Sequence, residues 1–132
     1  MRRTPIISAL IALVAMAAVI APAAMASGGG TTRSIALHGS ISFPNATGKA
    51  VSKVNGSERE LQIEVERIKV LAGKHVNVFV NGNKLASPLV SSLGIARVDR
   101  NTAKGQFVPI IKSGSTVRVR TLGGTLIASG TF

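Results

Sequence analysis

The feature that most limits the fold of this chain is a hydrophobic period of two residues. The segment from Glu58 to Arg67 shows it best, because Leu61, Ile63 and Val65 alternate there with glutamate and glutamine. Alternate side chains of a β-strand lie on opposite faces of a sheet, so such a segment has one buried face and one solvated face. No stretch after residue 26 shows the 3.6-residue period of a helix. The pattern therefore predicts an all-β domain.

Turn-forming residues separate these strands at intervals of roughly 8 to 12 residues, as in sandwiches built from hairpins. Asn81-Gly82 and Gly123-Gly124 each predict a tight hairpin turn. Further turn signals are PNATG at 44–48, VNGS at 54–57 and NTAKG at 101–105. Pro109 has no backbone N–H group, which bars its segment from a central position in a sheet. The predicted fold class is an all-β, antiparallel β-sandwich of about seven or eight strands.

Side-chain phase adds three finer expectations. The segment at 33–43 is predicted to be one half-buried strand. Its apolar face consists of Ile35, Leu37, Ile41 and Phe43. The phase slips after Val65, since Ile68 lies an odd number of residues further on, and we expect a bulge or a short edge connection there. At least three of the four phenylalanines are expected in the core.

The first 26 residues are interpreted as a signal peptide. Arg2 and Arg3 precede an uncharged apolar run, and Ala24-Met25-Ala26 supplies the small-x-small pattern of a cleavage site. The alternative is an uncleaved membrane anchor, because the uncharged stretch at 4–32 is long enough to span a bilayer. The cleavage site favours removal of the segment.

Cleavage after Ala26 defines the domain organisation that we expect. A flexible lead-in at 27–32 would precede a single β-sandwich domain at 33–132. The protein would be exported by the general secretory route to the periplasm or to the outside of the cell. No transmembrane segment is expected after signal cleavage.

The processed domain is strongly basic. Without Arg2 and Arg3 it keeps 14 of the 16 basic side chains against 5 acidic ones, a formal charge near +9. Such a charge attracts anionic polymers, although it also serves solubility alone. The chain has no cysteine, which excludes disulfides and a lipoprotein anchor. Tryptophan and tyrosine are also absent, which argues against sugar-stacking platforms and against sequence-specific recognition of nucleic acid.

Groups able to carry catalysis are few. His38 and His75 are the only histidines, and Asp99 is the only aspartate. A hydrolase triad would combine Asp99, one histidine and a serine, but no Gly-x-Ser-x-Gly motif indicates it. Glu64 and Glu66 share a strand face, where solvated glutamates paired with Lys or Arg are commoner than a catalytic pair. We expect no enzymatic activity, no metal site and no cofactor.

Anion binding has four candidate residues, which are Arg97, Lys112, Arg118 and Arg120. Arg118 and Arg120 alternate with valines, so they share the solvated face of their strand. Together with Arg97 or Lys112 they would form a cationic stripe. The alternative, which we prefer, has glutamates opposite the two arginines that neutralise them. These glutamates are Glu60, Glu64 and Glu66.

The register of the last hairpin also has two solutions. A two-residue Gly-Gly turn pairs Arg120 with Ile127, whereas a three-residue Leu-Gly-Gly turn pairs it with Leu126. The segment from Thr125 to Ser129 is apolar on both faces, so alternation does not decide between them.

Three segments together carry a family resemblance: ELQIEVE at 60–66, AGKHVNVFVNG at 72–82 and GSTVRVRTLGGTLIASGTF at 114–132. This combination is similar to small secreted bacterial domains of uncharacterised activity. Those domains are compact β-sandwiches made of hairpins, and they commonly end in a strand of the Ser-Gly-Thr-Phe kind. The resemblance implies export and a sandwich fold, and it carries over no functional residue.

We therefore expect an exported, non-enzymatic domain that acts as a structural or interaction module at the cell envelope or outside the cell. The sequence does not identify its partner, for which an anionic polymer and an envelope protein are the candidates. The alternative function is an electrostatic binder of a wall polymer, polysaccharide or nucleic acid through lysine and arginine. A small hydrolase or a metal protein is the third alternative.

Overall fold

A computed structural model describes residues 30–132 of the protein. The signal peptide assigned to residues 1–26 lies outside these residues. The strands are β1 Thr31–Gly39, β2 Thr47–Asn55, β3 Glu58–Glu66, β4 Val76–Val80, β5 Asn83–Ala86, β6 Ala96–Asn101, β7 Thr116–Thr121 and β8 Leu126–Thr131. Two short 3₁₀ helices, η1 Lys69–Leu71 and η2 Thr102–Lys104, interrupt the series. β1 begins at Thr31, within the lead-in expected at 27–32, and residues 27–29 of that lead-in lie outside the described residues.

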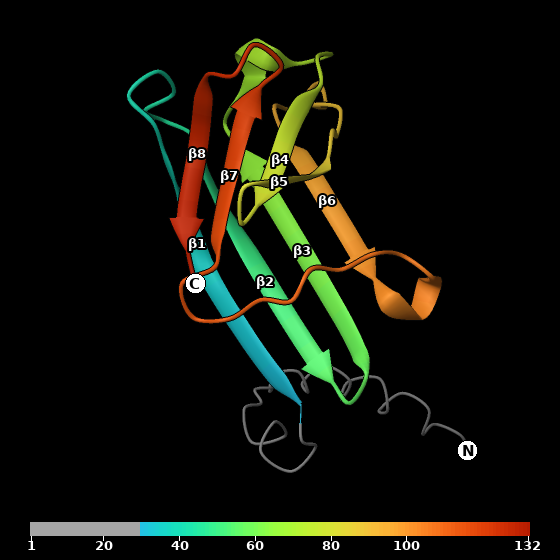
Figure 1. Ribbon diagram of the computed structural model, residues 1–132. Coiled ribbons are helices and arrows are strands. Elements are labelled where there is room, and N and C mark those ends of the chain that lie inside the picture. The colour runs from blue at the N-terminus through green and yellow to red at the C-terminus, as the bar shows by residue number, and fades with distance from the viewer. Residues whose placement is uncertain (1–29) are drawn as a thin grey trace, which may run out of the picture.

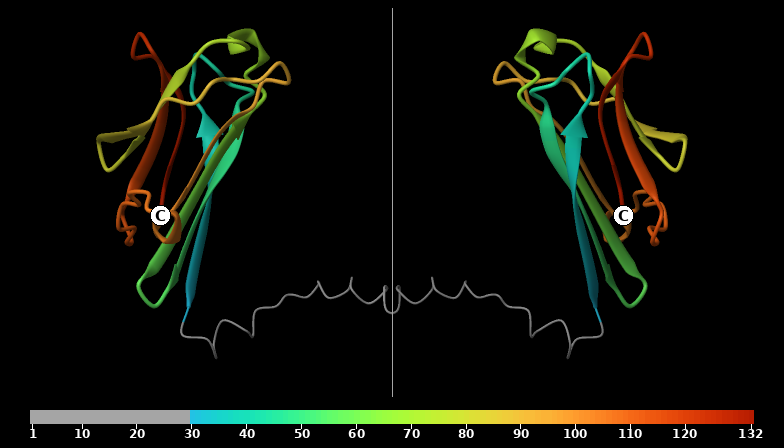
Figure 2. Two further views of the ribbon diagram at one scale, coloured as in Figure 1. Left: turned by 90° about the vertical axis from the view of Figure 1, so that its right-hand side faces the viewer. Right: turned by 90° about the vertical axis from the view of Figure 1, so that its left-hand side faces the viewer.

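All eight strands belong to one antiparallel sheet in the order β5-β4-β7-β8-β1-β2-β3-β6 (Figure 1). The sheet curls so that its half β5-β4-β7-β8 faces its half β1-β2-β3-β6 (Figure 2). The predicted all-β, antiparallel class is confirmed. The two separate sheets of a sandwich are not found, because His38 and Gly39 of β1 pair with Ser129 and Ala128 of β8. The result is a nearly closed, barrel-like sheet.

The core lies between the two halves and follows from alternation. β3 directs Leu61, Ile63 and Val65 inward, while β7 directs Val117 and Val119 inward, and all five side chains are buried. Each fully buried aliphatic side chain contributes roughly 1.5–3 kcal/mol relative to exposure. Opposite faces of the same strands carry the charged residues, so the alternation that builds the core also fixes where the charges lie.

The hairpin turns form where the sequence predicts them. Asn81 and Gly82 connect β4 to β5 with positive φ angles of 52° and 83°, the conformation that Asn-Gly turns adopt readily. The last hairpin combines both registers considered above. Arg120 pairs with Leu126 near the turn, but a bulge follows and Val119 pairs with Ala128. The bulge places one extra residue in β8, which is why both Ile127 and Ala128 are buried.

The strand expected at 33–43 ends early. β1 stops at Gly39, and Ile41 is 97% exposed rather than buried. A Cβ atom at Gly39 would collide with the carbonyl oxygens of Phe43 and Ala46, so the chain folds back tightly over this glycine. The turn is fixed by Ser40, whose hydroxyl donates a 2.6 Å hydrogen bond to the carbonyl oxygen of Leu126.

The phase slip after Val65 is a short connection and not a bulge. Arg67 takes a positive φ of 66°, after which η1 turns the chain. Ile68 is nevertheless buried, and its N–H donates to the carbonyl oxygen of Gly94.

The expectation that three phenylalanines lie in the core is wrong. Phe43 and Phe132 pack against the core. Phe79 alternates with buried valines on β4 and therefore lies on the outer face, and Phe107 belongs to the irregular segment that contains Pro109. The side chain of Phe107 is 68% exposed and therefore does not belong to the core.

Two inward-facing arginines hold the open side of the sheet between β5 and β6. Arg100 of β6 donates from Nη2 to the carbonyl oxygen of Leu85 on β5, at 2.9 Å. Arg59 of β3 donates from Nε and Nη2 to the carbonyl oxygen of Val108, at 3.2 and 2.9 Å. Inward-pointing charges are a known device that keeps edge strands from pairing with other chains. The bond from Arg100 thus joins the two halves where backbone pairing does not, and the bonds from Arg59 hold the segment that contains Val108 beside β3.

The close approach at Gly39 makes a stability prediction. Gly39→Ala should lower the free energy of unfolding by about 1–3 kcal/mol, because backbone atoms must move to admit the methyl group. Gly123→Ala is the matched control, since the nearest atom to its Cβ position is Thr121 Oγ1 at 3.9 Å. Its effect should stay within about 0.5 kcal/mol. Urea denaturation measures both values, and equal effects would show that the turn over Gly39 is not tight.

Candidate functional site

A row of side chains crosses five strands on the outer face of the sheet. The pairing registers place Lys84 of β5 opposite Phe79 of β4, Phe79 opposite Arg118 of β7, Arg118 opposite Ser129 of β8, and Ser129 opposite His38 of β1. Directly paired residues share a face, so all five side chains point outward. Lys84, Arg118 and His38 are exposed, while Phe79 and Ser129 are half-buried. We call these five residues the cationic row.

The half of the sheet that carries most of this row contains no acidic residue. The five acids of the chain are Glu58, Glu60, Glu64, Glu66 and Asp99. The four glutamates belong to β3, and Asp99 belongs to β6. The strands β4, β5, β7 and β8 carry Lys84, Arg118 and Arg120 as their only charged residues. The outer face of this half is therefore positive without local compensation.

The preferred expectation, that glutamates of β3 neutralise the arginines of β7, is wrong. β7 pairs with β4 and β8, whereas β3 pairs with β2 and β6. Arg120 instead donates from Nη1 to the carbonyl oxygen of Gly124, at 3.0 Å. Arg118 has Phe79 and Ser129 as its cross-strand neighbours. The alternation of apolar and polar residues does not show which strands are adjacent in the sheet. Strand adjacency decides which charged side chains lie next to each other, so the expected ion pairs do not form.

The expected cationic stripe forms only in part. Arg118 and Arg120 share a face, but Arg97 lies on β6, with its side chain outward from the opposite half of the sheet. There it pairs with Glu64 in register, and its Nε lies 3.5 Å from Asp99 Oδ2, the one ion pair among residues 30–132. Lys112 is exposed in the segment that leads into β7. Two of the four candidates thus belong to one face.

The groups that a hydrolase would need lie apart. His38 belongs to the row described above, whereas His75 precedes β4 and its Nδ1 lies 2.8 Å from the carbonyl oxygen of Ser87. Asp99 is on the other half of the sheet, beside Arg97. In the part of the chain that the structure describes, no group of three His, Cys, Asp or Glu side chains could hold a metal ion.

Four residues of the cationic row were not among the anion-binding candidates from the sequence. They are Lys84, Phe79, Ser129 and His38, the last of which was considered only for catalysis. Lys84 follows the Asn81-Gly82 turn, and hairpin geometry alone places it beside Phe79. That signal was available. The pairing of Phe79 with Arg118 could not be predicted in this way, because it depends on β4 and β7 being neighbours. The two strands start 40 residues apart, at Val76 and Thr116, and β5 and β6 lie between them in the sequence.

Comparisons of the chain with protein-family models, with curated proteins and with solved structures find no match. The family resemblance stated above therefore stays a prediction. Among residues 30–132, no helix has the length and apolar character needed to cross a membrane.

The absence of acidic neighbours makes a second stability prediction. At an ionic strength near 10 mM, Lys84→Gln and Arg118→Gln should each leave the free energy of unfolding unchanged or raise it by less than about 0.5 kcal/mol, because each removes like-charge repulsion. The gain should vanish near 0.15 M salt, where the screening length is about 8 Å. A loss of more than about 1 kcal/mol in urea denaturation would show that these side chains hold stabilising partners.

Proposed function

We propose that this protein is an exported, non-enzymatic domain that binds an anionic polymer on the outer face of β5-β4-β7-β8. The observation that supports the proposal is the cationic row, which lies mostly on a half of the sheet without acidic residues. The signal peptide expected at residues 1–26 and the resemblance to small secreted bacterial domains support a location at the cell envelope or outside the cell.

The shape of the face suits a polymer better than a small anion. Adjacent strands lie about 4.8 Å apart, so Lys84 and Arg118, two strands apart, present charges roughly 10 Å from each other. A small anion would need donors converging on one point, whereas an extended polyanion meets charges spaced along a line. Such binding releases counterions from the polymer and therefore weakens as salt rises.

The other half of the sheet provides the contrast within the same molecule. On its outer face, Lys49 of β2 and Arg97 of β6 flank Glu64 of β3 in one register row. Positive and negative side chains alternate there, so their fields cancel over short distances. This mixed row and the cationic row each contain two lysine or arginine residues. The two rows differ because an acidic residue, Glu64, lies between the two positive charges of the mixed row.

The test compares double variants of equal charge on the two faces. Lys84→Gln with Arg118→Gln should weaken retention on immobilised heparin and lower the salt slope of binding by about one for each lost contact. Lys49→Gln with Arg97→Gln removes the same two charges from the mixed row and should change retention much less. Elution salt and fluorescence anisotropy with a labelled polyanion measure the difference.

Two results would overturn the proposal. Equal weakening by the two double variants would mean that net charge alone, and not this face, governs binding. Absent or salt-insensitive retention of the unmodified protein would remove electrostatic polymer binding altogether.

A further inference from the structure

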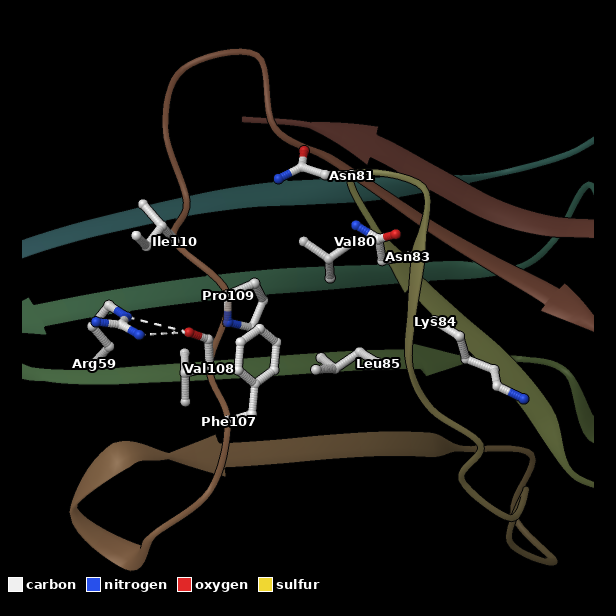
Figure 3. A pocket seen from close by; sticks show the side chains of 10 residues that line it. All are labelled: Arg59, Val80, Asn81, Asn83, Lys84, Leu85, Phe107, Val108, Pro109 and Ile110. Atoms are coloured by element: carbon white, nitrogen blue, oxygen red, sulfur yellow. Dashed lines mark hydrogen bonds between the residues drawn. The ribbon is translucent and has the colours of Figure 1, made fainter.

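A pocket of about 260 Å³ lies between the β4–β5 hairpin and the segment at 107–110. Figure 3 shows Val80 and Leu85 on the hairpin side and Phe107 and Pro109 on the other side. The pocket is at the open side of the sheet, where no backbone pairing joins β5 to β6. Its walls are mainly the apolar side chains of two segments that are distant in sequence.

The rim of this pocket leaves large apolar side chains in water. Phe107 is 68% exposed and Ile110 is 62% exposed. Both residues line the pocket and follow one another within four positions of the same segment. Exposed apolar side chains gathered around a concave site are a common mark of ligand binding.

One end of the pocket carries a positive charge without a carboxylate beside it. Arg59 gives two of its five N–H groups to the carbonyl oxygen of Val108, and no acidic residue lines the pocket. The neighbouring Glu58 and Glu60 alternate onto the outer face of β3, where Asn55 and Lys53 are their register partners. The guanidinium therefore has donors left for a ligand, at a place where the protein supplies no counter-charge.

Lys84 also lines the pocket, but its role differs. In Figure 3 its ammonium group extends away from Val80 and Leu85, in keeping with its place in the cationic row on the outer face. Arg59 lies at the opposite end of the site. The charge that a ligand inside the pocket would meet is thus that of Arg59.

We propose that this pocket binds a small anionic amphiphile, a medium-chain carboxylate whose apolar chain lies between Leu85 and Phe107 and whose carboxylate meets Arg59. A bidentate guanidinium–carboxylate contact is among the stronger charge-assisted hydrogen bonds. The volume is slightly below the roughly 300–1,000 Å³ of sites for drug-sized ligands, which suits a short chain and not a long lipid tail. This site borders the polymer-binding face at Lys84, but its ligand would contact Arg59 and the apolar walls.

The test is an NMR titration of the protein with decanoate below its micelle concentration, following the methyl signals of Val80 and Leu85. These signals should shift and saturate. Decyltrimethylammonium has an alkyl chain of similar length but a cationic head group. It should bind at least about tenfold more weakly, which corresponds to a difference of about 1.4 kcal/mol in binding free energy. Absent or unsaturable shifts, or equal affinity for both amphiphiles, would overturn the proposal.

Two variants test the charged end and the apolar end of the pocket independently. Arg59→Gln should weaken decanoate binding several-fold and abolish the preference for the anionic head. Phe107→Ser changes a side chain that is already exposed, so it should leave the fold intact and weaken both amphiphiles alike. Unchanged decanoate binding by Phe107→Ser would contradict the pocket as the site even if Arg59→Gln failed to fold.

A further variant distinguishes this proposal from the proposed function. Arg118→Gln should weaken binding of the polyanion and leave decanoate binding unchanged, because Arg118 does not line the pocket. Loss of decanoate binding in Arg118→Gln would mean that the carboxylate binds the outer face, and the pocket proposal would then be wrong.

Discussion

The interaction on which the whole structure depends is the burial of one face of a curled sheet against itself. Val78, Val119 and Ala128 on one half and Leu37 and Ile63 on the other are almost completely shielded from water. Burial of apolar surface is the main favourable contribution to folding, and this chain has no disulfide to add to it. The strands therefore direct most of their apolar residues inward and most of their charged residues outward, with Arg59 and Arg100 as inward-facing exceptions at the open side of the sheet.

The distribution of charge is a consequence of that constraint together with strand order. The glutamates alternate with the core residues of β3, so they all lie outward from the half β1-β2-β3-β6. No acid occurs on β4, β5, β7 or β8, and the lysine and arginine side chains there lie outward without partners of opposite charge. The molecule is therefore mixed in charge on one side and positive on the other.

Local sequence patterns predicted the local structure well. Alternation located β3, β4 and β7, and Asn81-Gly82 marked a turn whose positive φ angles those residue types tolerate. The early end of β1 was not predicted, because the apolar alternation at 33–43 does not show that the backbone of Phe43 and Ala46 folds back over Gly39. The hydrogen bond from Ser40 to Leu126 that fixes this turn reaches a strand distant in the sequence. The bulge in β8 was not predicted either. The segment Thr125 to Ser129 is apolar on both faces, so it fits either register until the residues that it packs against are known.

The candidate site was predicted incorrectly because the sequence did not show which strands are neighbours in the sheet. Arg118 and Arg120 were identified as outward-facing, which is correct, but their neighbours were taken to be glutamates. Sandwiches and barrel-like sheets share the same alternation, so the sequence left open whether β8 would meet β1. The pairing of β1 with β8 places His38 beside Ser129 and so adds His38 to the cationic row. This neighbour can be identified only when the full strand order is known.

The cationic row of Lys84, Phe79, Arg118, Ser129 and His38 is proposed to be one continuous outer surface that contacts a polyanion. Backbone amide NMR of the protein, titrated with a heparin-derived oligosaccharide, tests it most directly. We expect cross-strand nuclear Overhauser effects between Phe79 and Arg118, with ligand-induced shifts concentrated on β4, β5, β7 and β8. Shifts centred on Lys49 and Arg97, or spread evenly over both halves of the sheet, would contradict it.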